Sequence, residues 1–211
     1  MKAIILAAGF GNRMSPLTDN KHKTLIEVNG QTILDRIIQS LLLNQVNQIV
    51  IVTGYRSEDL VNYVQNRYAN AIFEFVHNPR YRETNNVYSL ALAFEQIEIK
   101  EDIILIESDL IYTSDVIEQV VHSKYENVAL VSPYMTGLDG TVVKITDNRI
   151  TNIYPPHLQD EQFNLFDKFK TLNIYKFSAS FCQNEFKKLL IYYAKVIDDN
   201  CYYELILGIL I

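Results

Sequence analysis

The sequence predicts an α/β fold built on a doubly wound sheet, and three observations lead to this expectation. Short apolar runs typical of buried strands alternate with segments that carry apolar residues at helical spacing, as far as Ser132. The connections between these segments are short, as in parallel βαβ units. The chain has 211 residues, which is enough to bury a substantial core.

The N-terminal segment supplies the first predicted element, a buried strand over Ala3-Ile4-Ile5-Leu6-Ala7-Ala8 that ends at a glycine-rich loop. An Asn29-Gly30 turn and a helix cap at Ser57 mark two further boundaries. Further strands are expected over 24–28, 48–53, 72–76, 103–106 and 128–132. Helices are expected over 31–43, after Ser57, over 85–94 and after Ser114-Asp115.

The pattern changes after Pro133, where Asp147-Asn148 predicts the turn of an antiparallel hairpin. The hairpin strands, a strand that returns to the sheet and two closing helices are expected over 141–146, 149–154, 170–177, 184–196 and 202–211. Since no repeat or linker is evident, residues 1–211 are expected to form a single domain. The apolar end, Leu207 to Ile211, fits either a terminus docked into the core or the N-terminal module of a longer protein.

Composition excludes several classes of protein. The net charge is −6, so the cations near the N-terminus are a local concentration, which favours a small anionic ligand over nucleic acid. The two cysteines, Cys182 and Cys201, lack metal-ligand spacing and are expected to be reduced thiols. No apolar run approaches the roughly 20 residues that span a bilayer. We therefore expect a cytoplasmic protein without membrane contact.

The loop after the first strand carries the chemistry. Gly9 and Gly11 let the backbone approach a ligand and turn amide N–H groups toward anions, and Arg13 and Lys23 add positive charge. This combination predicts a polyphosphate site, with an ordinary strand-to-loop turn as the alternative. A dinucleotide fingerprint does not fit, because Met14 stands where its third glycine belongs, and no Walker loop is present.

The run from Leu6 to Met14, together with Pro16-Leu17-Thr18 and Lys23, resembles the signature of nucleotidyltransferases that activate small phosphates. That signature reads L-A-A-G-x-G-x-R-[LM]-x-P-L-T, followed by P-K-x-L, and here His22 replaces its second proline. The resemblance implies a Rossmann-like doubly wound mixed sheet of the nucleotidyltransferase type. It also implies nucleotide-binding roles for Leu6, Ala8, Gly9 and Gly11, and catalytic roles for Arg13 and Lys23.

Two acidic residues are candidates for holding Mg²⁺. Asp109 follows the predicted strand over 103–106, so it should face the crevice at the carboxyl ends of the strands. A carboxylate facing an anionic ligand needs a hard cation between them, and Mg²⁺ fits. The resemblance gives Asp109 the place of the metal-binding aspartate in an acidic-x-Asp motif. It gives Glu204, in Cys201-Tyr202-Tyr203-Glu204, the place of the second metal ligand.

The middle of the chain narrows the resemblance. The segments 78–81 and 84–90 resemble the base-recognition region of CTP:phosphocholine and CTP:phosphonate cytidylyltransferases, which implies that Asn85, Asn86 and Ser89 bind the pyrimidine. Helix capping is the alternative role of these residues. The segments 139–144 and 170–176 resemble the acceptor side of the phosphonate-activating enzymes, with Asp139 and Lys144 as acceptor-binding residues.

These observations predict a Mg²⁺-dependent cytidylyltransferase that joins CMP from CTP to a small phosphonate or phosphomonoester and releases pyrophosphate. The best candidate acceptor is 2-aminoethylphosphonate, because the chain has no tryptophan for a choline cage. The alternatives are a CTP:phosphocholine cytidylyltransferase, a sugar-1-phosphate uridylyl- or thymidylyltransferase, and a non-catalytic regulatory domain of the same fold. The sequence leaves the oligomeric state open.

Overall fold

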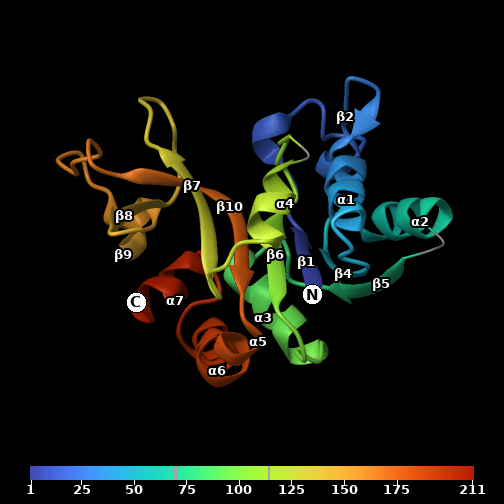
Figure 1. Ribbon diagram of the computed structural model, residues 1–211. Coiled ribbons are helices and arrows are strands. Elements are labelled where there is room, and N and C mark those ends of the chain that lie inside the picture. Colours follow the sequence, from blue (N-terminus) through green and yellow to red (C-terminus); the bar gives the residue numbers. More distant parts are fainter. Residues whose placement is uncertain (69–70, 114) are drawn as a thin grey trace.

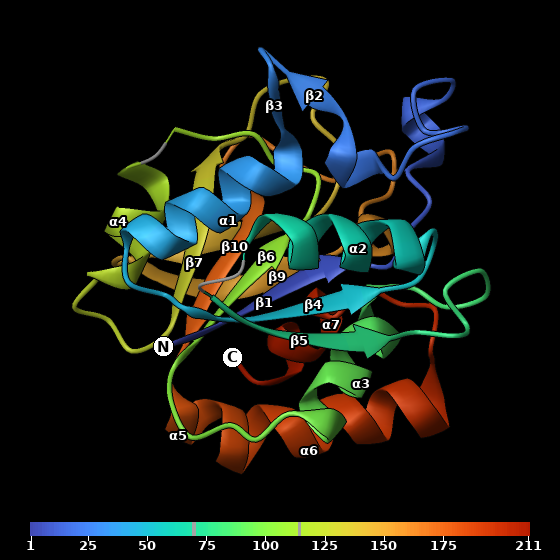
Figure 2. The same cartoon turned by 90° about the vertical axis from the view of Figure 1, so that its right-hand side faces the viewer.

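A central mixed sheet lies between two layers of helices in the computed structural model, which describes residues 1–68, 71–113 and 115–211 (Figures 1 and 2). The helices on one face are α1 (Ile33–Leu43), α2 (Ser57–Arg67) and α4 (Asp115–Val121). The helices on the other face are α3 (Asn86–Gln96), α5 (Ala179–Phe181), α6 (Lys187–Tyr192) and α7 (Glu204–Ile209).

The main sheet combines a parallel half with an antiparallel half. Its strands follow the order β5 (Ile72–His77), β4 (Gln48–Thr53), β1 (Lys2–Ala7), β6 (Ile103–Glu107), β10 (Phe169–Phe177), β8 (Val142–Thr146) and β9 (Arg149–Tyr154), while β7 (Val128–Pro133) also pairs with β10. The first four strands are parallel, and β10 runs antiparallel to β6, β7 and β8. The predicted doubly wound mixed sheet is therefore confirmed.

Strand β1 lies in the interior of the sheet, between β4 and β6, and both of its faces are apolar. Ile4 and Leu6 pack into the core beneath α3, whereas Ala3, Ile5 and Ala7 pack into the core beneath α1. Side chains alternate between the faces of a strand, so an uninterrupted apolar run can be buried only between two layers.

Two short turns agree with the sequence. Asn29 and Gly30 have φ angles of 52° and 75° and join β2 (Glu27–Val28) to β3 (Gln31–Thr32). Asp147 and Asn148 have φ angles of 51° and 60° and join β8 to β9. Both positions of a type I′ hairpin turn need positive φ, which asparagine, aspartate and glycine tolerate best.

Several predicted boundaries are wrong. Helix α1 begins at Ile33, because Gln31–Thr32 pairs with β2 and the Thr32 hydroxyl accepts the N–H of Asp35. Thr24 and Leu25, expected to begin a strand over 24–28, belong instead to a 3₁₀ turn over Lys23–Leu25. Ser57 does not cap α2, because Arg56 occupies that position in a left-handed conformation. Ser114, proposed to precede a helix, lies outside the described residues.

The C-terminal helices also differ from expectation. A helical stretch begins at α5 and continues through α6 to residue 197, with π-helical segments at Cys182–Phe186 and Tyr193–Ile197. It starts five residues earlier than predicted, because the Ser178 side chain caps it by accepting the N–H of Phe181. Within the described ranges, no helix is both long and apolar enough to cross a membrane.

Candidate active site

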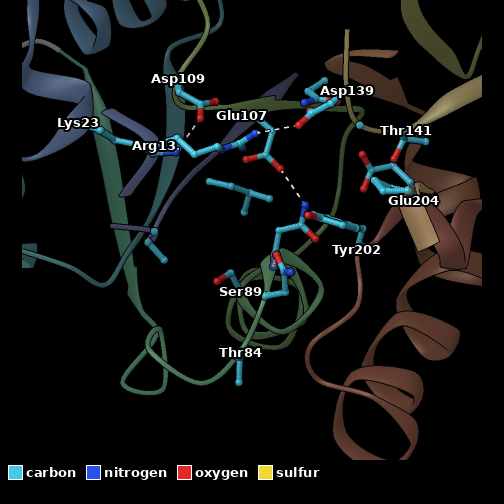
Figure 3. A pocket seen from close by; sticks show the side chains of 18 of the residues that line it. Arg13, Lys23, Thr84, Ser89, Glu107, Asp109, Asp139, Thr141, Tyr202 and Glu204 are labelled. Carbon is cyan, nitrogen blue, oxygen red and sulfur yellow. Dashed lines mark hydrogen bonds and ion pairs between the residues drawn. The ribbon is translucent and has the colours of Figure 1, made fainter. Parts of the chain in front are cut away.

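A cavity of about 580 Å³ opens where β1 and β6 end, at the edge of the sheet where the sequence analysis placed the ligand (Figure 3). Its lining residues are Leu6, Ala8, Gly9, Arg13, Lys23, Tyr81, Thr84, Asn85, Asn86, Ser89, Glu107, Asp109, Asp139, Gly140, Thr141, Pro156, Lys170, Asn173, Tyr202 and Glu204. The fold thus gathers residues from both ends of the chain around one space. Of the predicted site residues, only Gly11 and Lys144 are outside this lining.

The two glycines of the loop serve different purposes. Gly9 lines the cavity, and a Cβ built there would meet no atom within 4 Å, so its backbone is open to a ligand. Gly11 has a φ of 72°, and a Cβ there would come within 2.9 Å of the Lys23 Cβ. Gly11 is therefore needed for the loop to pack against Lys23, and its predicted contact with the nucleotide finds no support in the cavity lining.

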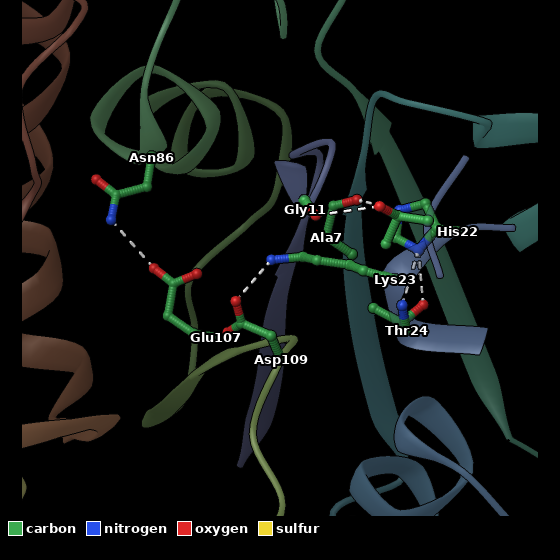
Figure 4. Close-up of polar contacts among 9 residues, drawn as sticks. Ala7, Gly11, His22, Lys23, Thr24, Asn86, Glu107 and Asp109 are labelled. Atoms are coloured by element: carbon green, nitrogen blue, oxygen red, sulfur yellow. Dashed lines mark hydrogen bonds and ion pairs between the residues drawn. The ribbon is translucent and has the colours of Figure 1, made fainter. Parts of the chain in front are cut away.

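His22, which replaces the signature proline, ties this loop to β1 (Figure 4). Its Nδ1 accepts the backbone N–H of Thr24 at 3.2 Å, so the ring proton must be on Nε2, which donates to the carbonyl of Ala7 at 3.0 Å. The ring is completely buried, and burial lowers the pKa of His22 to about 4, with the Lys23 charge acting in the same direction. The neutral imidazole of His22 therefore makes two hydrogen bonds, to Ala7 and Thr24, and these hold the loop in place around Lys23.

Lys23 reaches across the floor of the cavity to the end of β6. Its Nζ donates to Asp109 Oδ2 at 2.9 Å, and its side chain is only 10% exposed (Figure 4). Burial alone would raise the pKa of Asp109, but the charge and hydrogen bond of Lys23 hold that pKa below its usual value. The pair places a fixed cation and an ionised carboxylate where the phosphates of a ligand would arrive.

Two further carboxyl groups line the same cavity. Burial raises the pKa of Glu107 to about 8 against the opposing effect of Lys23, and the nearby carboxylates of Glu204 and Asp109 raise it further. Burial also raises the pKa of Glu204 to about 7, with Lys170 acting in the opposite direction. Figure 3 shows Glu107 between Asp109 and Glu204. Near neutral pH, these raised pKa values keep much of both groups protonated, and a bound cation would favour their charged forms.

The predicted base-binding residues lie at the start of α3. Asn85 caps the helix, accepting the N–H of Asn86, and its own amide donates to Asn200 O at 3.3 Å. Asn86 donates to Glu107 Oε1 at 3.1 Å and accepts the N–H of Tyr203 at 3.0 Å. Both ends of each amide therefore already bond within the protein, whereas Ser89 also lines the cavity from the next turn.

The acceptor side differs from expectation in its lysine. Lys144 is exposed and lies outside the cavity, so the structure gives no support to its predicted role. The cavity takes its lining from Asp139 to Thr141, and Lys144 is three residues farther along β8, about 10 Å for an extended chain. Lys170, on β10, lines the cavity instead.

Arg13 and Asp139 meet across the mouth of the cavity. Arg13 Nη1 lies 3.5 Å from Asp139 Oδ2, and the two side chains are 86% and 83% exposed. An exposed pair at this distance contributes little to stability, so either side chain can turn toward a ligand.

Comparison with known proteins places this site in a family. Residues 3–154 match the MobA-like NTP transferase domain. This chain belongs to the MobA-like NTP transferase family. It is therefore an enzyme of the nucleotidyltransferase type, as the sequence predicted.

Named relatives in this family support the expected resemblance to CTP-dependent enzymes. A CTP:phosphoglutamine cytidylyltransferase of Campylobacter jejuni is 30% identical over 197 residues, covering 86% of this chain and 74% of the relative. A choline-phosphate cytidylyltransferase of Haemophilus influenzae is 35% identical over 129 residues, covering 61% and 52%. A 2-aminoethylphosphonate cytidylyltransferase of Lancefieldella rimae is 38% identical over 117 residues, covering 56% and 41%.

A solved cytidylyltransferase structure shows the same fold. The CTP:phosphocholine cytidylyltransferase of Streptococcus pneumoniae superposes with a TM-score of 0.73 at 21% identity, over 98% of this chain and 83% of that one. At this identity the comparison supports the fold alone.

The donor set fits a hard cation bound together with a nucleotide. Glu204 Oε2 is a buried carboxylate oxygen without a hydrogen-bond partner among the described residues. Within those residues, no three His, Cys, Asp or Glu side chains converge tightly enough to hold a metal by themselves. Mg²⁺ does not need such a cluster, because it is commonly held by one or two carboxylates together with substrate phosphates.

Sequence analysis missed Glu107, Lys170 and Thr141 as site residues. Glu107 is the acidic member of the motif that ends in Asp109, and Lys170 and Thr141 stand inside segments assigned to the acceptor side. The motifs contained the signal, but only the strand ends and pairing decide which of their residues reach the cavity.

The buried state of His22 has a measurable consequence for stability. Between pH 6.5 and 4 the unfolded imidazole takes up a proton and the folded one does not, so the free energy of unfolding falls by up to about 3 kcal/mol over this window. His22→Gln keeps a donor toward Ala7 without an ionisable ring. We expect urea unfolding from pH 4 to 8 to show a smaller loss in this variant, and parallel curves would contradict the assignment.

Proposed function

We propose that this enzyme is a Mg²⁺-dependent cytidylyltransferase that transfers CMP from CTP to a small phosphonate or phosphomonoester, with 2-aminoethylphosphonate as the preferred acceptor. The supporting observation is the cavity itself, which combines three basic side chains with four carboxyl groups at the carboxyl ends of β1 and β6. The basic side chains are Arg13, Lys23 and Lys170, and the carboxyl groups are those of Glu107, Asp109, Asp139 and Glu204.

The reaction needs alignment and charge neutralisation more than proton transfer. An acceptor oxygen forms a bond to the α-phosphorus of CTP, the bond from that phosphorus to the bridging α,β-oxygen breaks, and pyrophosphate leaves with the electron pair. Because the acceptor is already an oxyanion, no strong general base is required. Lys23, held by Asp109 at 2.9 Å, offsets the charge that gathers at the α-phosphate.

The remaining residues hold the two substrates in line. The open backbone at Gly9 and the exposed charge of Arg13 suit the triphosphate. Lys170 suits the phosphonate of the acceptor, in the place that Lys144 cannot reach. Asp109 and Glu204 would hold Mg²⁺, which supplies electrostatic stabilisation of the phosphate oxygens when bound.

The names of the relatives support the choice of CTP. The three relatives described above are named for cytidylyl transfer, to phosphoglutamine, to choline phosphate or to 2-aminoethylphosphonate. Their shared donor and differing acceptors suggest that the nucleotide site is common and that the acceptor side varies.

The lining of the acceptor side favours a primary ammonium over a quaternary one. Asp139, Thr141 and Asn173 offer hydrogen-bond acceptors, and the aromatic residues that line the cavity are Tyr81 and Tyr202. A quaternary ammonium is usually enclosed by several aromatic rings, whereas a primary ammonium needs acceptors and a carboxylate. This polar lining supports 2-aminoethylphosphonate.

We expect kcat/KM with CTP and Mg²⁺ to be higher for 2-aminoethylphosphonate than for phosphocholine, measured as pyrophosphate release under matched conditions. A clear preference for phosphocholine would contradict the phosphonate assignment and leave cytidylyl transfer standing. Turnover with sugar 1-phosphates alone would contradict both, and no turnover with any acceptor would favour a non-catalytic domain.

A matched pair of lysine variants tests the acceptor side within the same assay. Lys170→Ala should raise KM for the acceptor by on the order of tenfold or more, because a charge-assisted hydrogen bond is lost. Lys144→Ala, on the exposed part of β8, should leave KM unchanged. Equal effects of the two substitutions would remove Lys170 from the acceptor site.

A further inference from the structure

Asn78 organises the base-recognition segment from beneath. It directly follows β5 and is completely buried. The N–H of Arg80 donates to Asn78 Oδ1 at 2.8 Å, which fixes the orientation of the amide. Asn78 Nδ2 must therefore be the donor to Thr84 Oγ1 at 3.1 Å and to Ser89 Oγ at 3.0 Å. Both hydrogens of this amide are thus committed to hydroxyl groups that belong to residues lining the cavity.

The direction of these bonds decides where the hydroxyl hydrogens go. The Thr84 hydroxyl donates a hydrogen bond to the carbonyl of Arg80 at 2.9 Å. Ser89 Oγ accepts from Asn78, so its own hydrogen must be donated elsewhere. In the described part of the chain, the hydroxyl hydrogen of Ser89 has no protein acceptor. The hydroxyl of Ser40, a serine within α1, differs in this respect, because it donates to the carbonyl of Ile37 at 2.8 Å. The Ser89 hydrogen is therefore available to a ligand.

The other two base-binding candidates are less free. The amides of Asn85 and Asn86 each use their oxygen and their nitrogen in bonds to other parts of the protein. Ser89 therefore differs from both asparagines. Its oxygen accepts a hydrogen bond from one buried neighbour, Asn78, and its hydrogen bonds to no other described residue. Figure 3 shows Ser89 at the α3 side of the cavity, apart from the carboxylates.

We propose that Asn78 sets base selectivity by holding Ser89 as a hydrogen-bond donor toward ring nitrogen N3 of the pyrimidine, which selects cytosine over uracil. This inference rests on the proposed function and extends it. Cytosine N3 carries a lone pair and accepts the Ser89 hydrogen, whereas uracil N3 carries a hydrogen and opposes it. Asn78 touches no substrate and is a positioning residue.

Asn78→Asp tests the direction of the bond. A carboxylate still accepts the N–H of Arg80 but has no hydrogen to give, so Ser89 must donate to it and turn a lone pair toward the base. We expect kcat/KM for CTP relative to UTP to fall by about tenfold or more, with the loss confined to CTP. The assay is run at pH 8, because burial raises the pKa of a carboxyl group and a protonated one would restore the original direction.

Ser89→Ala provides a second test that introduces no buried charge, and it decides the question if Asn78→Asp does not fold. It should weaken CTP binding, measured by calorimetry, and leave UTP binding unchanged. Ser40→Ala, a buried serine in α1 away from the cavity, is the control and should change neither. An unaltered ratio of CTP to UTP affinity in Ser89→Ala would overturn the proposal.

Different outcomes would contradict the proposed function and the proposed base selectivity. If the wild-type enzyme binds CTP but transfers CMP to no acceptor, the proposed function fails, and the ratio of CTP to UTP affinity, measured by calorimetry on Asn78→Asp and Ser89→Ala, still tests the base-selectivity proposal. If the wild type transfers CMP and the folded variants keep its CTP preference, the proposed role of Asn78 and Ser89 in base selectivity is wrong and the proposed function stands.

Discussion

Lys23→Ala should lower the turnover number for cytidylyl transfer by at least about a hundredfold, the loss typical of a removed electrostatic contact to a transition state. Lys23 Nζ is held at 2.9 Å from Asp109 on a side chain that is 10% exposed, so it meets a ligand already oriented and largely dehydrated. Asp109 keeps 37% of its side chain exposed, so solvent limits the cost of leaving it unpaired. The fold should therefore survive, which circular dichroism and the melting temperature check.

Lys21→Ala is the matched control for this experiment. Lys21 lies two residues earlier in the same loop, pairs with Glu27 at the surface at 3.4 Å and does not line the cavity. It should retain a rate close to that of the wild type. Arg13→Ala, which removes the exposed cation at the mouth, is expected to lower turnover by a similar factor to Lys23→Ala. Near-normal rates in both purified cavity variants would remove this loop from the mechanism.

Asp109→Asn should abolish Mg²⁺-dependent activity. The substitution keeps the shape of the side chain and removes the charge, so a hard cation loses its oxygen ligand and Lys23 loses its ionic partner. We expect no recovery at high Mg²⁺. Mn²⁺ binding in the presence of CTP, followed by electron paramagnetic resonance, provides a readout independent of turnover and should weaken in parallel.

Glu204→Gln should raise the Mg²⁺ concentration required for half-maximal activity and lower the maximal rate. The Glu204 oxygen that is buried and has no hydrogen-bond partner among the described residues is the second expected ligand. Asp115→Asn is the control, since Asp115 lies on α4 outside the cavity and bonds to Gln119 at 2.9 Å. If Glu204→Gln keeps the Mg²⁺ dependence of the wild type, the second ligand lies elsewhere, with Glu107 the next carboxylate in the lining.

Local sequence predicted most of the fold. The apolar run of β1, the Asn29-Gly30 turn and the Asp147-Asn148 turn are each specified by neighbouring residues, because burial on both faces or positive φ is a local requirement. The loop from Gly9 to Lys23 was predicted for the same reason, since its glycines and cations lie within one short segment.

Boundaries were less predictable where two local preferences compete for the same residue. Ser57 has the chemistry of a cap, yet its hydroxyl donates to Thr53 Oγ1 at 2.8 Å, and Arg56 takes the position before the helix. Gln31 begins a segment with helical spacing of apolar residues, but it pairs with Val28 and so belongs to a short hairpin. In both places the competing partner is only three or four residues away along the chain, and its hydrogen bonds outweigh the preference that the sequence pattern indicates.

The sequence by itself determined the fold class, the family and the segments that carry the site, because these follow from local patterns of burial and spacing. Only the tertiary structure decided that Lys170 and not Lys144 lines the cavity, that Arg13 meets Asp139 from 126 residues away, and that His22 fixes the loop through Ala7. The physical reason is that a side chain acquires its partners from the pairing and stagger of distant strands. No local pattern specifies that the cavity lining stops at Thr141, just before β8, and includes Lys170 on β10.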